Sequence, residues 1–269
     1  MPELPDVQVF KEYFDATSLH KRIAQVVECD RRLLEKISRK AFRGRLKDKS
    51  FEATVRHGKY LFARFGVNDW LVLHFGMTGF LRAFKAEEKA PDDIGLLLRF
   101  EDGYHLAYDC RRRLGRIGCT ESVAHFVDEK NLGPDALDLC RDEEAFAGRL
   151  EGHRGAIKTL LMNQKVVAGI GNIYADEILF LMGLHPKTKA GELDDGQCRA
   201  LAAKTRHILE TAIDRRAGAE GWPESWLLPR REEGRACPRC SGKIHRITVS
   251  GRGTYFCPRH QVENRSGPS

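Results

Sequence analysis

Apolar and polar residues alternate with a period of two through much of the first half of the chain. Within residues 51–65, Leu61, Ala63 and Phe65 fall on one face of an extended strand, and the intervening side chains face the other way. Further short apolar runs bounded by turn-forming residues lie at 71–75 and 96–100. The pattern predicts several short antiparallel strands, arranged as a sandwich or barrel, between about residues 22 and 135.

Helical spacing marks the start of the chain and its second half. Val7, Phe10 and Phe14 recur about one helical turn apart, and Pro5 suits the first turn of a helix. After a composition shift near Gly133, further helical segments separated by glycine-containing breaks are predicted at 142–150, 156–163, 172–183 and 194–216. The chain is therefore predicted to be of the α+β class, with a strand-rich first part and a helical second part.

Length and composition are those of a two-domain protein with real cores. The chain has 269 residues, of which 42% are hydrophobic. No apolar run approaches the roughly 20 residues of a membrane helix, and the charges of Glu3 and Asp6 exclude a signal peptide. We therefore expect a soluble cytoplasmic protein.

The charge balance favours a polyanionic partner. Lysine and arginine number 45 against 38 acids, which gives a net charge of +7 and a pI near 9.0. Nucleic acid is the first partner to consider for such a balance. The segment between Asp30 and Lys49 is especially rich in basic residues and is either a basic binding face or a solvated one.

The eight cysteines fall into two groups. Five are scattered singly, as expected for reduced and often buried thiols: Cys29, Cys110, Cys119, Cys140 and Cys198. The others belong to two pairs of the form Cys-Pro-Arg-Cys and Cys-Pro-Arg-His, separated by sixteen residues. Two pairs with this spacing present four donors tetrahedrally to Zn²⁺.

We predict one structural Zn²⁺ ion, which folds a β-hairpin whose strands flank the turn at residues 250–253. Its predicted ligands are Cys237, Cys240, Cys257 and His260. His245 is a competing histidine, but it lies in the middle of a strand and has no partner at the ligand spacing.

The first residues carry a second chemical signal. Removal of Met1 before a small residue leaves Pro2 with a free secondary amine. A terminal amine titrates near about 7.7–8.0, so a useful fraction is neutral and can attack carbon to form a Schiff base. Glu3 would act as the general acid or base. The alternative interpretation is an ordinary helix start.

Two further residues are candidates for binding phosphate. Asn172 opens a predicted helix after a glycine-bearing double turn, where it is either a helix cap or a phosphate ligand together with the backbone N–H groups. Arg252 lies between two glycines at the predicted hairpin tip and would reach a phosphate. A solvated arginine in a turn is the alternative.

Four motifs together resemble the formamidopyrimidine-DNA glycosylase/endonuclease VIII family. They span nearly the whole chain in the family's order, as Met-Pro-Glu-Leu-Pro at 1–5, His-Gly-Lys-Tyr-Leu at 57–61, Val-Ala-Gly-Ile-Gly-Asn-Ile-Tyr-Ala at 167–175 and Gly-Arg-Gly-Thr-Tyr-Phe-Cys at 251–257. The resemblance is closer to the formamidopyrimidine-DNA glycosylase branch. It implies an N-terminal antiparallel β-sandwich, a helix-two-turns-helix domain and a zinc hairpin, which bind damaged duplex DNA.

The resemblance also implies domain boundaries. The expected parts are a catalytic β-sandwich (1–133), a linker with the first helix of the second domain (134–150), a helix-two-turns-helix domain (151–221), a connector (222–236), a zinc hairpin (237–261) and a disordered tail (262–269).

Specific roles follow from the same motifs. Pro2 would be the nucleophile that attacks C1′ of the damaged nucleotide, and Glu3 the proton donor for opening of the sugar ring. Lys59 would donate a proton and contact the phosphate beside the lesion. Asn172 and Arg252 would hold flanking phosphates, with Arg252 also donating a proton in δ-elimination.

Other positions match residues that the family uses around the extruded base. Met77 would fill the gap in the duplex, Arg112 would face the orphaned base, and Leu114 would act as a wedge. Lys158 is a further candidate for a contact near the lesion. Leucine replaces the usual aromatic wedge, one extra residue precedes Gly115, and the connector is short for a branch that caps an oxidised purine.

The resemblance therefore implies a bifunctional DNA glycosylase and abasic-site lyase of base excision repair. It would remove formamidopyrimidines and 8-oxoguanine in preference to oxidised pyrimidines and finish by β,δ-elimination. We expect a monomer that binds double-stranded DNA with oxidised bases or abasic sites, away from membranes and at a bacterial nucleoid. The alternative is a non-catalytic zinc protein that binds damaged or distorted duplex, which is favoured if Met1 is retained.

Overall fold

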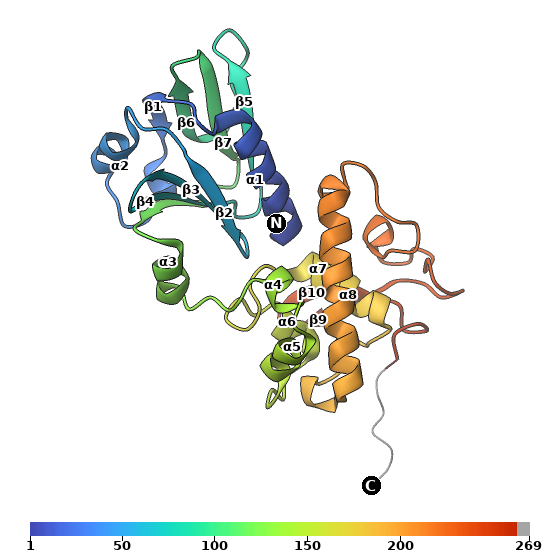
Figure 1. Cartoon of the computed structure of the whole chain (residues 1–269). Helices are drawn as coiled ribbons and strands as arrows, with labels where there is room; N and C mark the ends of the chain where they lie inside the picture. Colours follow the sequence, from blue (N-terminus) through green and yellow to red (C-terminus); the bar gives the residue numbers. More distant parts are fainter. Residues whose placement is uncertain (263–269) are drawn as a thin grey trace. The chain divides into compact units, whose positions relative to one another are not determined.

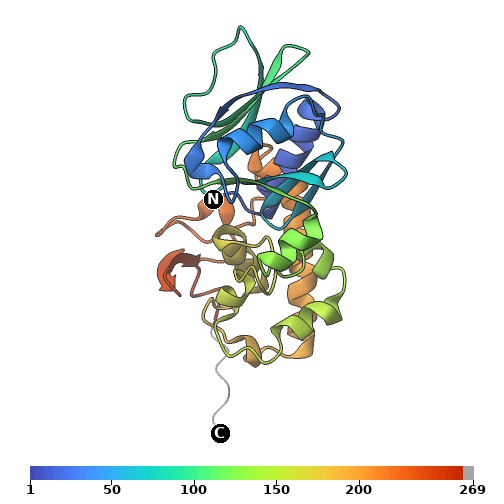
Figure 2. The same cartoon turned by 90° about the vertical axis from the view of Figure 1, so that its left-hand side faces the viewer.

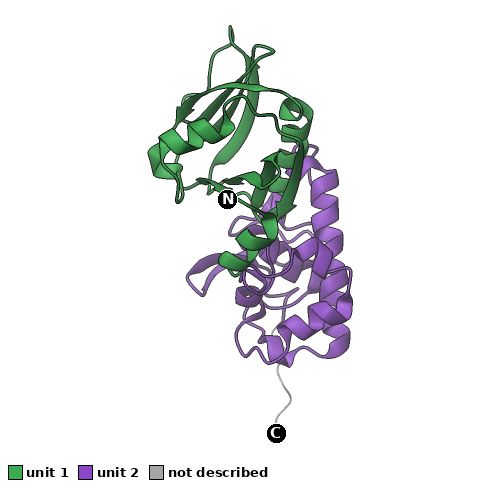
Figure 3. Cartoon of the chain, turned by 60° about the vertical axis from the view of Figure 1, so that its left-hand side comes forward, with its two compact units in different colours: residues 1–131 green, residues 132–269 purple. Residues whose placement is uncertain are grey.

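The structure is a computed structural model of the whole chain and describes residues 1–262. The predicted disordered tail lies, from residue 263 onward, outside the described residues. The chain divides into two compact units, residues 1–131 and 132–269 (Figure 3). None of the helices in the described part is long and apolar enough to cross a membrane.

The first unit is built mainly of strands. Its helices are α1 (Leu4–Ser18), α2 (Arg39–Leu46) and α3 (Val123–Glu129), with a short 3₁₀ turn at Arg31–Leu33. Its strands are β1 (Ile23–Cys29), β2 (Ala53–His57), β3 (Tyr60–Gly66), β4 (Asp69–His74), β5 (Gly79–Lys85), β6 (Ile94–Phe100), β7 (Tyr104–Cys110) and β8 (Arg116–Thr120).

The strands form two four-stranded antiparallel sheets that share one apolar core. One sheet has the order β1-β6-β7-β5 and the other β2-β3-β4-β8 (Figure 1). Leu61, Ala63 and Phe65 all lie in this core, as their alternation along the chain predicts. The opposite face of β3 is buried too, because Phe62 packs against Phe126 of α3 with ring centroids 5.3 Å apart. The predicted antiparallel sandwich is confirmed.

Helix α2 lies in the region, residues 22–135, that was predicted to be mainly strands and turns, and it was not itself predicted. Ser38 caps the helix, since its hydroxyl accepts the N–H of Ala41 at 3.2 Å. Phe42 and Leu46, four residues apart, are both buried against the sandwich. Most residues of α2 are charged, so the two apolar residues that form its buried face, Phe42 and Leu46, were too few to indicate a helix from the sequence.

The second unit is helical and ends in a hairpin. Its helices are α4 (Ala136–Leu139), α5 (Glu143–Leu150), α6 (Ile157–Leu161), α7 (Asn172–Met182) and α8 (Asp195–Asp214), and the hairpin strands are β9 (His245–Val249) and β10 (Arg252–Phe256). The four helices predicted in this part correspond to α5, α6, α7 and α8. Glycine ends α7, because Gly183 takes the left-handed conformation at φ 68°.

Two buried acids of α7 hold the rest of this unit together. The carboxylate of Glu177 accepts the backbone N–H groups of Leu227 and Leu228 at 3.0 and 2.8 Å. The neighbouring Asp176 accepts two N–H groups of Arg231, at 2.7 and 3.0 Å. The connector predicted between the helices and the hairpin is therefore docked onto α7 rather than left loose.

We predict that Glu177→Gln destabilises the protein by about 1–3 kcal/mol near pH 5, because an amide –NH₂ cannot accept a backbone N–H, whereas the hydroxyl oxygen of the protonated carboxyl can. Burial raises the pKa of Glu177 from 4.5 to about 7. Between pH 4.5 and pH 7 the folded state holds a proton on Glu177 that the unfolded state has released. The contribution of Glu177 to the free energy of unfolding therefore declines as the pH rises from about 4.5 to 7.

Chemical unfolding of the wild type and the variant at several pH values measures the difference. The penalty of the substitution is expected to shrink toward pH 7, and a constant or growing penalty would mean that Glu177 is ionised throughout. Glu224→Gln, in the exposed part of the same connector, is the control and should leave stability unchanged.

Candidate functional site

The N-terminus of α1 places two of the predicted catalytic residues side by side. Glu3 is the N-cap of the helix, directly after Pro2, and only 1% of its surface is exposed. The backbone N–H of Glu3 donates to the carboxylate of Asp6 at 2.8 Å. Burial, partly offset by that hydrogen bond and reinforced by the charge of Glu3, raises the pKa of Asp6 to about 6. A carboxyl group is thus fixed next to the residue whose amine becomes terminal when Met1 is removed.

Lys59 lies in the two-residue turn between β2 and β3. His57 pairs with Tyr60 across this hairpin, and Gly58 provides the left-handed conformation that the turn needs, with φ 55°. Lys59 is only 7% exposed. Burial, and then the nearby charge of Lys59, lower the pKa of His74 to about 4, so His74 is neutral at physiological pH. The structure thus places a cation and a neutral histidine close together at one end of the β2-β3-β4 strands.

The three predicted base-contacting residues of this unit come from two loops that touch. Met77, between β4 and β5, is 40% exposed, and Leu114, between β7 and β8, is 44% exposed. The backbone N–H of Arg112 donates to Thr78 at 3.2 Å. A Cβ on Gly76 would lie 2.5 Å from the carbonyl carbon of Leu114, so only glycine allows this approach. Exposed apolar side chains and an exposed arginine are brought together.

Arg113, between Arg112 and Leu114 in the second loop, has a structural role that the sequence did not reveal. Arg113 takes a left-handed conformation with φ 50°. Its guanidinium turns back into the unit, donating to the carbonyls of Asp93 and Ile94 at 2.9 and 2.7 Å. Arg112 and Leu114 on either side of it remain exposed. Arg113 therefore anchors the loop that carries the two predicted base contacts.

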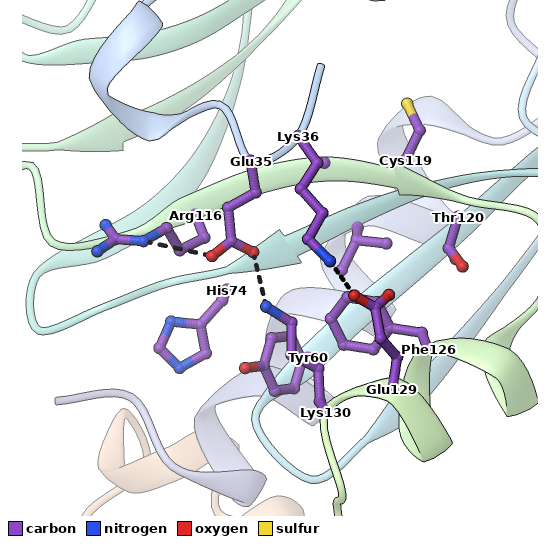
Figure 4. A pocket seen from close by; sticks show the side chains of 12 residues that line it. Glu35, Lys36, Tyr60, His74, Arg116, Cys119, Thr120, Phe126, Glu129 and Lys130 are labelled. Atoms are coloured by element: carbon purple, nitrogen blue, oxygen red, sulfur yellow. Dashed lines mark hydrogen bonds and ion pairs between the residues drawn. The ribbon is translucent and has the colours of Figure 1, made fainter.

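A separate small pocket lies on the α3 side of the β3-β4-β8 strands (Figure 4). Its cations are already paired, since Glu35 lies between Arg116 and Lys130 at 3.6 and 3.3 Å, and Lys36 pairs with Glu129. The cavity measures about 40 Å³, which is room for roughly one or two water molecules. It is too small to hold a nucleobase.

In the second unit, Asn172 joins α7 to the hairpin. Its side-chain amide donates to the carbonyl of Gly253 at 3.0 Å. The cap itself is Gly171, so Asn172 is the first helical residue and not the N-cap considered from the sequence. Its side-chain oxygen is buried without a hydrogen-bond partner among the described residues. The Asn172 side chain is thus hydrogen-bonded to Gly253, the residue that follows Arg252.

Arg252 is the first residue of β10 and is exposed. The turn itself consists of Ser250 and Gly251, both in left-handed conformations, and it is shorter than the four-residue turn predicted. The hydroxyl of Ser250 contacts that of Thr159 on α6 at 2.8 Å. A depression of about 260 Å³ lies here, lined partly by Arg252 and Lys158.

Lys158 is more deeply buried than its predicted contact with DNA would suggest. Only 1% of it is exposed, and its ammonium group lies 2.7 Å from Asp176 and 2.5 Å from the hydroxyl of Thr254. Asp176 also accepts the backbone N–H of Tyr255 at 3.2 Å. Lys158 on α6 thus bonds to Asp176 on α7 and to Thr254 on β10, and so holds the three elements together. The sequence analysis missed this network, although the adjacent acids Asp176 and Glu177 in the otherwise apolar α7 could have indicated it.

Three cysteines of the hairpin module form a metal-binding group. The sulfur atoms of Cys237, Cys240 and Cys257 lie within 4.8 Å of one another. Gly242 passes so close that a Cβ there would lie 2.8 Å from the sulfur of Cys257. Clustered soft donors on two tight turns fit one structural zinc ion.

His260 is not in that group as the structure stands. Its Nε2 lies 2.8 Å from the carbonyl oxygen of Phe180, and its ring packs on the Phe180 ring with centroids 5.0 Å apart. The carbonyl of Phe180 is one of the last in α7 and is available to a side-chain donor. When Nε2 carries the proton, Nδ1 is the nitrogen left to bind a metal.

Comparisons with known proteins cover most of the chain. Residues 1–117 match the model of the formamidopyrimidine-DNA glycosylase N-terminal domain, and residues 132–221 match the formamidopyrimidine-DNA glycosylase H2TH domain. Residues 234–259 match a zinc finger found in FPG and IleRS.

Relatives are similar along their whole length. Formamidopyrimidine-DNA glycosylases of Symbiobacterium thermophilum and Geobacter metallireducens are each 33% identical, over 97% of this chain and 89% and 100% of their own.

Solved structures agree with the sequence relatives. A MutM complex with DNA containing carbocyclic 8-oxo-G has a TM-score of 0.88 at 28% identity, and the Lactococcus lactis enzyme with abasic-site DNA has 0.87 at 26%. Both cover 97% of this chain and all of their own. With two domain models, a zinc-finger model and relatives that are 33% identical over nearly the whole chain, the chain belongs to the formamidopyrimidine-DNA glycosylase family.

Proposed function

We propose that this protein is a bifunctional DNA glycosylase and abasic-site lyase of base excision repair, which acts on oxidised bases in double-stranded DNA through Pro2. The observation that carries the proposal is the start of α1, where a buried Glu3 immediately follows Pro2. A secondary amine and a carboxyl group held together supply the nucleophile and the proton carrier of such a reaction. Membership of the glycosylase family supports the substrate class.

In the glycosylase step, the neutral amine of Pro2 attacks C1′ of the damaged nucleotide. The bond from C1′ to the base breaks, and the base leaves with a proton. Glu3 protonates the ring oxygen O4′, the sugar ring opens, and the C1′–nitrogen bond becomes an iminium ion. The carboxyl of Glu3 is confined by its burial to the neighbourhood of the reacting centre.

In the lyase steps, the iminium ion acidifies the proton on C2′. Loss of that proton expels the 3′ phosphate, and a second elimination expels the 5′ phosphate. Water then hydrolyses the iminium, which frees Pro2. We assign proton donation to Lys59 and Arg252 in these steps, because each is a cation that also binds phosphate.

The remaining residues position the DNA. Lys59, Asn172 and Arg252 are proposed to bind phosphates of the damaged strand. The exposed side chains of Met77, Arg112 and Leu114 are proposed to occupy the gap that the extruded nucleotide leaves. The two loops that carry them are held together through Gly76, which supports a fixed wedge rather than a mobile one.

For the substrate, we propose formamidopyrimidines and 8-oxoguanine in preference to oxidised pyrimidines. The named substrate of the family and the presence of Met77 support this preference. The connector is docked onto α7 through Leu227, Leu228 and Arg231, and its length and fixed position would limit how it caps an extruded base.

Zinc has a structural role in this proposal. It would hold the hairpin strands in register and thereby present Arg252. We propose His260 as the fourth ligand through Nδ1, with Nε2–H donating to the Phe180 carbonyl, since metal-binding histidines commonly donate their second nitrogen to such an acceptor.

We predict that Pro2→Gly strongly lowers the yield of the covalent adduct that borohydride traps on abasic-site DNA, while binding of that DNA is roughly retained. The physical reason is that glycine supplies a primary amine without the ring that orients proline. A chain with one lysine inserted after Met1 is the matched control, because it keeps Pro2 but acylates its nitrogen. Loss of binding in either variant would show that the terminus is part of the DNA interface and not the nucleophile.

Glu3→Gln should slow base excision by about 10²–10⁴-fold, the usual contribution of a positioned proton donor. Cleavage of a ready-made abasic site should suffer less, because that substrate already lacks the base. Single-turnover rates on a formamidopyrimidine duplex and on an abasic duplex separate the two steps. Equal losses on both would remove the acid role, and Glu12→Gln on the same helix controls for changes in helix charge.

Removal of zinc by a chelator, or Cys240→Ser, should disorder the hairpin and weaken binding to abasic-site DNA at least as much as Arg252→Ala does. The expected cause is loss of the frame that presents Arg252. Metal content by mass spectrometry and DNA binding by fluorescence anisotropy are measured together. His260→Cys should retain zinc, whereas unchanged binding by the zinc-free protein would contradict the positioning role.

A further inference from the structure

The basic segment singled out in the sequence is a surface that the proposed reaction does not use. Residues 31–49 contain nine basic and two acidic residues, an excess equal to the +7 net charge of the whole chain. Most of the segment's length is α2 and the loop that precedes it. Helix α2 packs against β1, whereas α1 packs against β2, β3 and β5, and Figures 1 and 2 show the two helices on different sides of this unit.

The acids of this region do not neutralise it. Glu35 pairs with Arg116 and Lys130, and Asp48 lies 4.0 Å from Arg22. Both acids of the segment are therefore paired with cations that lie outside the segment. Three basic residues of the segment are paired with acids elsewhere: Arg32, Lys36 and Arg45. Six others are exposed and make no ion pair among the described residues: Arg31, Arg39, Lys40, Arg43, Lys47 and Lys49.

Three of these cations form a stripe. Arg39, Arg43 and Lys47 follow one another at intervals of four residues, about 6 Å apart along α2 and its C-cap. Arg43 and Lys47 lie about 100° around the helix from Phe42 and Leu46, the buried residues that directly precede them, and Arg39 lies closer to that buried side. Like charges at this spacing destabilise a helix. A stripe of this kind therefore costs stability and is not a neutral solvated face.

The stripe borders an open depression with more positive charge. Arg43 and Lys47 line it together with Arg99 of β6 and the backbone of β1 at Gln25, and its volume is about 420 Å³. Arg99 is exposed, and Gln25 is its partner in the β1–β6 register. Glu28 on β1 is the acid closest along the strand, and it makes no ion pair with the stripe. Regularly spaced cations beside a shallow groove fit a phosphate backbone.

We propose that Arg39, Arg43, Lys47 and Arg99 form a second DNA-binding surface, which holds an undamaged duplex segment while the catalytic face holds the lesion. The proposal rests on the proposed function for the identity of the first duplex. A surface on another side of the unit would let the enzyme pass directly from one segment to the next, because the new duplex is bound before the old one leaves.

Direct transfer has a kinetic signature. The full-length protein is bound to a short fluorescent duplex carrying a non-cleavable abasic-site analogue, and release is followed after adding increasing unlabelled undamaged duplex. For the wild type, the release rate is expected to rise with the concentration of the added duplex. For Arg39→Gln/Arg43→Gln/Lys47→Gln, it should be independent of that concentration. A rate that is independent for the wild type as well overturns the proposal.

Two controls keep the outcome specific. Arg149→Gln/Arg154→Gln/Arg199→Gln removes the same charge from the second unit, at residues that are exposed and make no ion pair within residues 1–262, and should behave as the wild type. If it also loses transfer, net charge and not α2 is responsible, and the assignment fails. If the α2 variant loses incision of a short lesion duplex, the stripe binds the lesion duplex itself, which also refutes a second segment.

The salt dependence provides an independent measurement. Each lost phosphate contact lowers the slope of log affinity against log salt by about 0.9, so the α2 variant should bind undamaged duplex with a slope smaller by about 2.7. The assay uses no chemistry at Pro2. Failure of transfer therefore leaves the lyase proposal intact, and failure of borohydride trapping leaves this proposal intact.

Discussion

The second unit depends on one buried carboxylate, that of Asp176. It contacts the ammonium of Lys158, the guanidinium of Arg231 and the backbone N–H of Tyr255, and so joins α6, the connector and β10 to α7. Buried charges are tolerated when each is paired, and removal of one partner from such a pair typically costs about 3–5 kcal/mol. The hairpin that carries Arg252 is therefore held by this network on one side and by the cysteine cluster on the other.

In the first unit, backbone geometry rather than buried charge positions the side chains that are proposed to act on DNA. The side chains proposed to be functional lie at the start of α1, in a tight turn and on loops, where nothing in the sheets themselves would fix them. The cap of α1 fixes Glu3, a glycine in a two-residue turn places Lys59, and close approach of two loops at Gly76 groups the exposed residues. Rigid sheets with loops pinned at glycine let exposed side chains remain ordered.

The placement of charge separates two kinds of basic residue. Lys158 and Arg231 both pair with the buried Asp176, although the family resemblance made Lys158 a candidate for a contact near the lesion. Arg39, Lys40 and Arg43 of α2 are exposed and make no ion pair among the described residues, although the segment was indistinguishable from a solvated face in the sequence. Which arginines and lysines remain available to a polyanion is decided by the acids that folding brings to them, so total charge alone says little.

The sequence by itself determined the class of fold and the metal-binding cysteines, and it supplied the proposal of a catalytic terminus. These features are local: alternation within β3, the spacing of Cys237 and Cys240, and the position of Pro2 at the start of the chain. Tertiary structure alone decided the burial of Lys158, the anchoring role of Arg113 and the docking of the connector on Glu177. Each of these depends on partners distant in sequence, and no local pattern records which buried acid or carbonyl a side chain will meet.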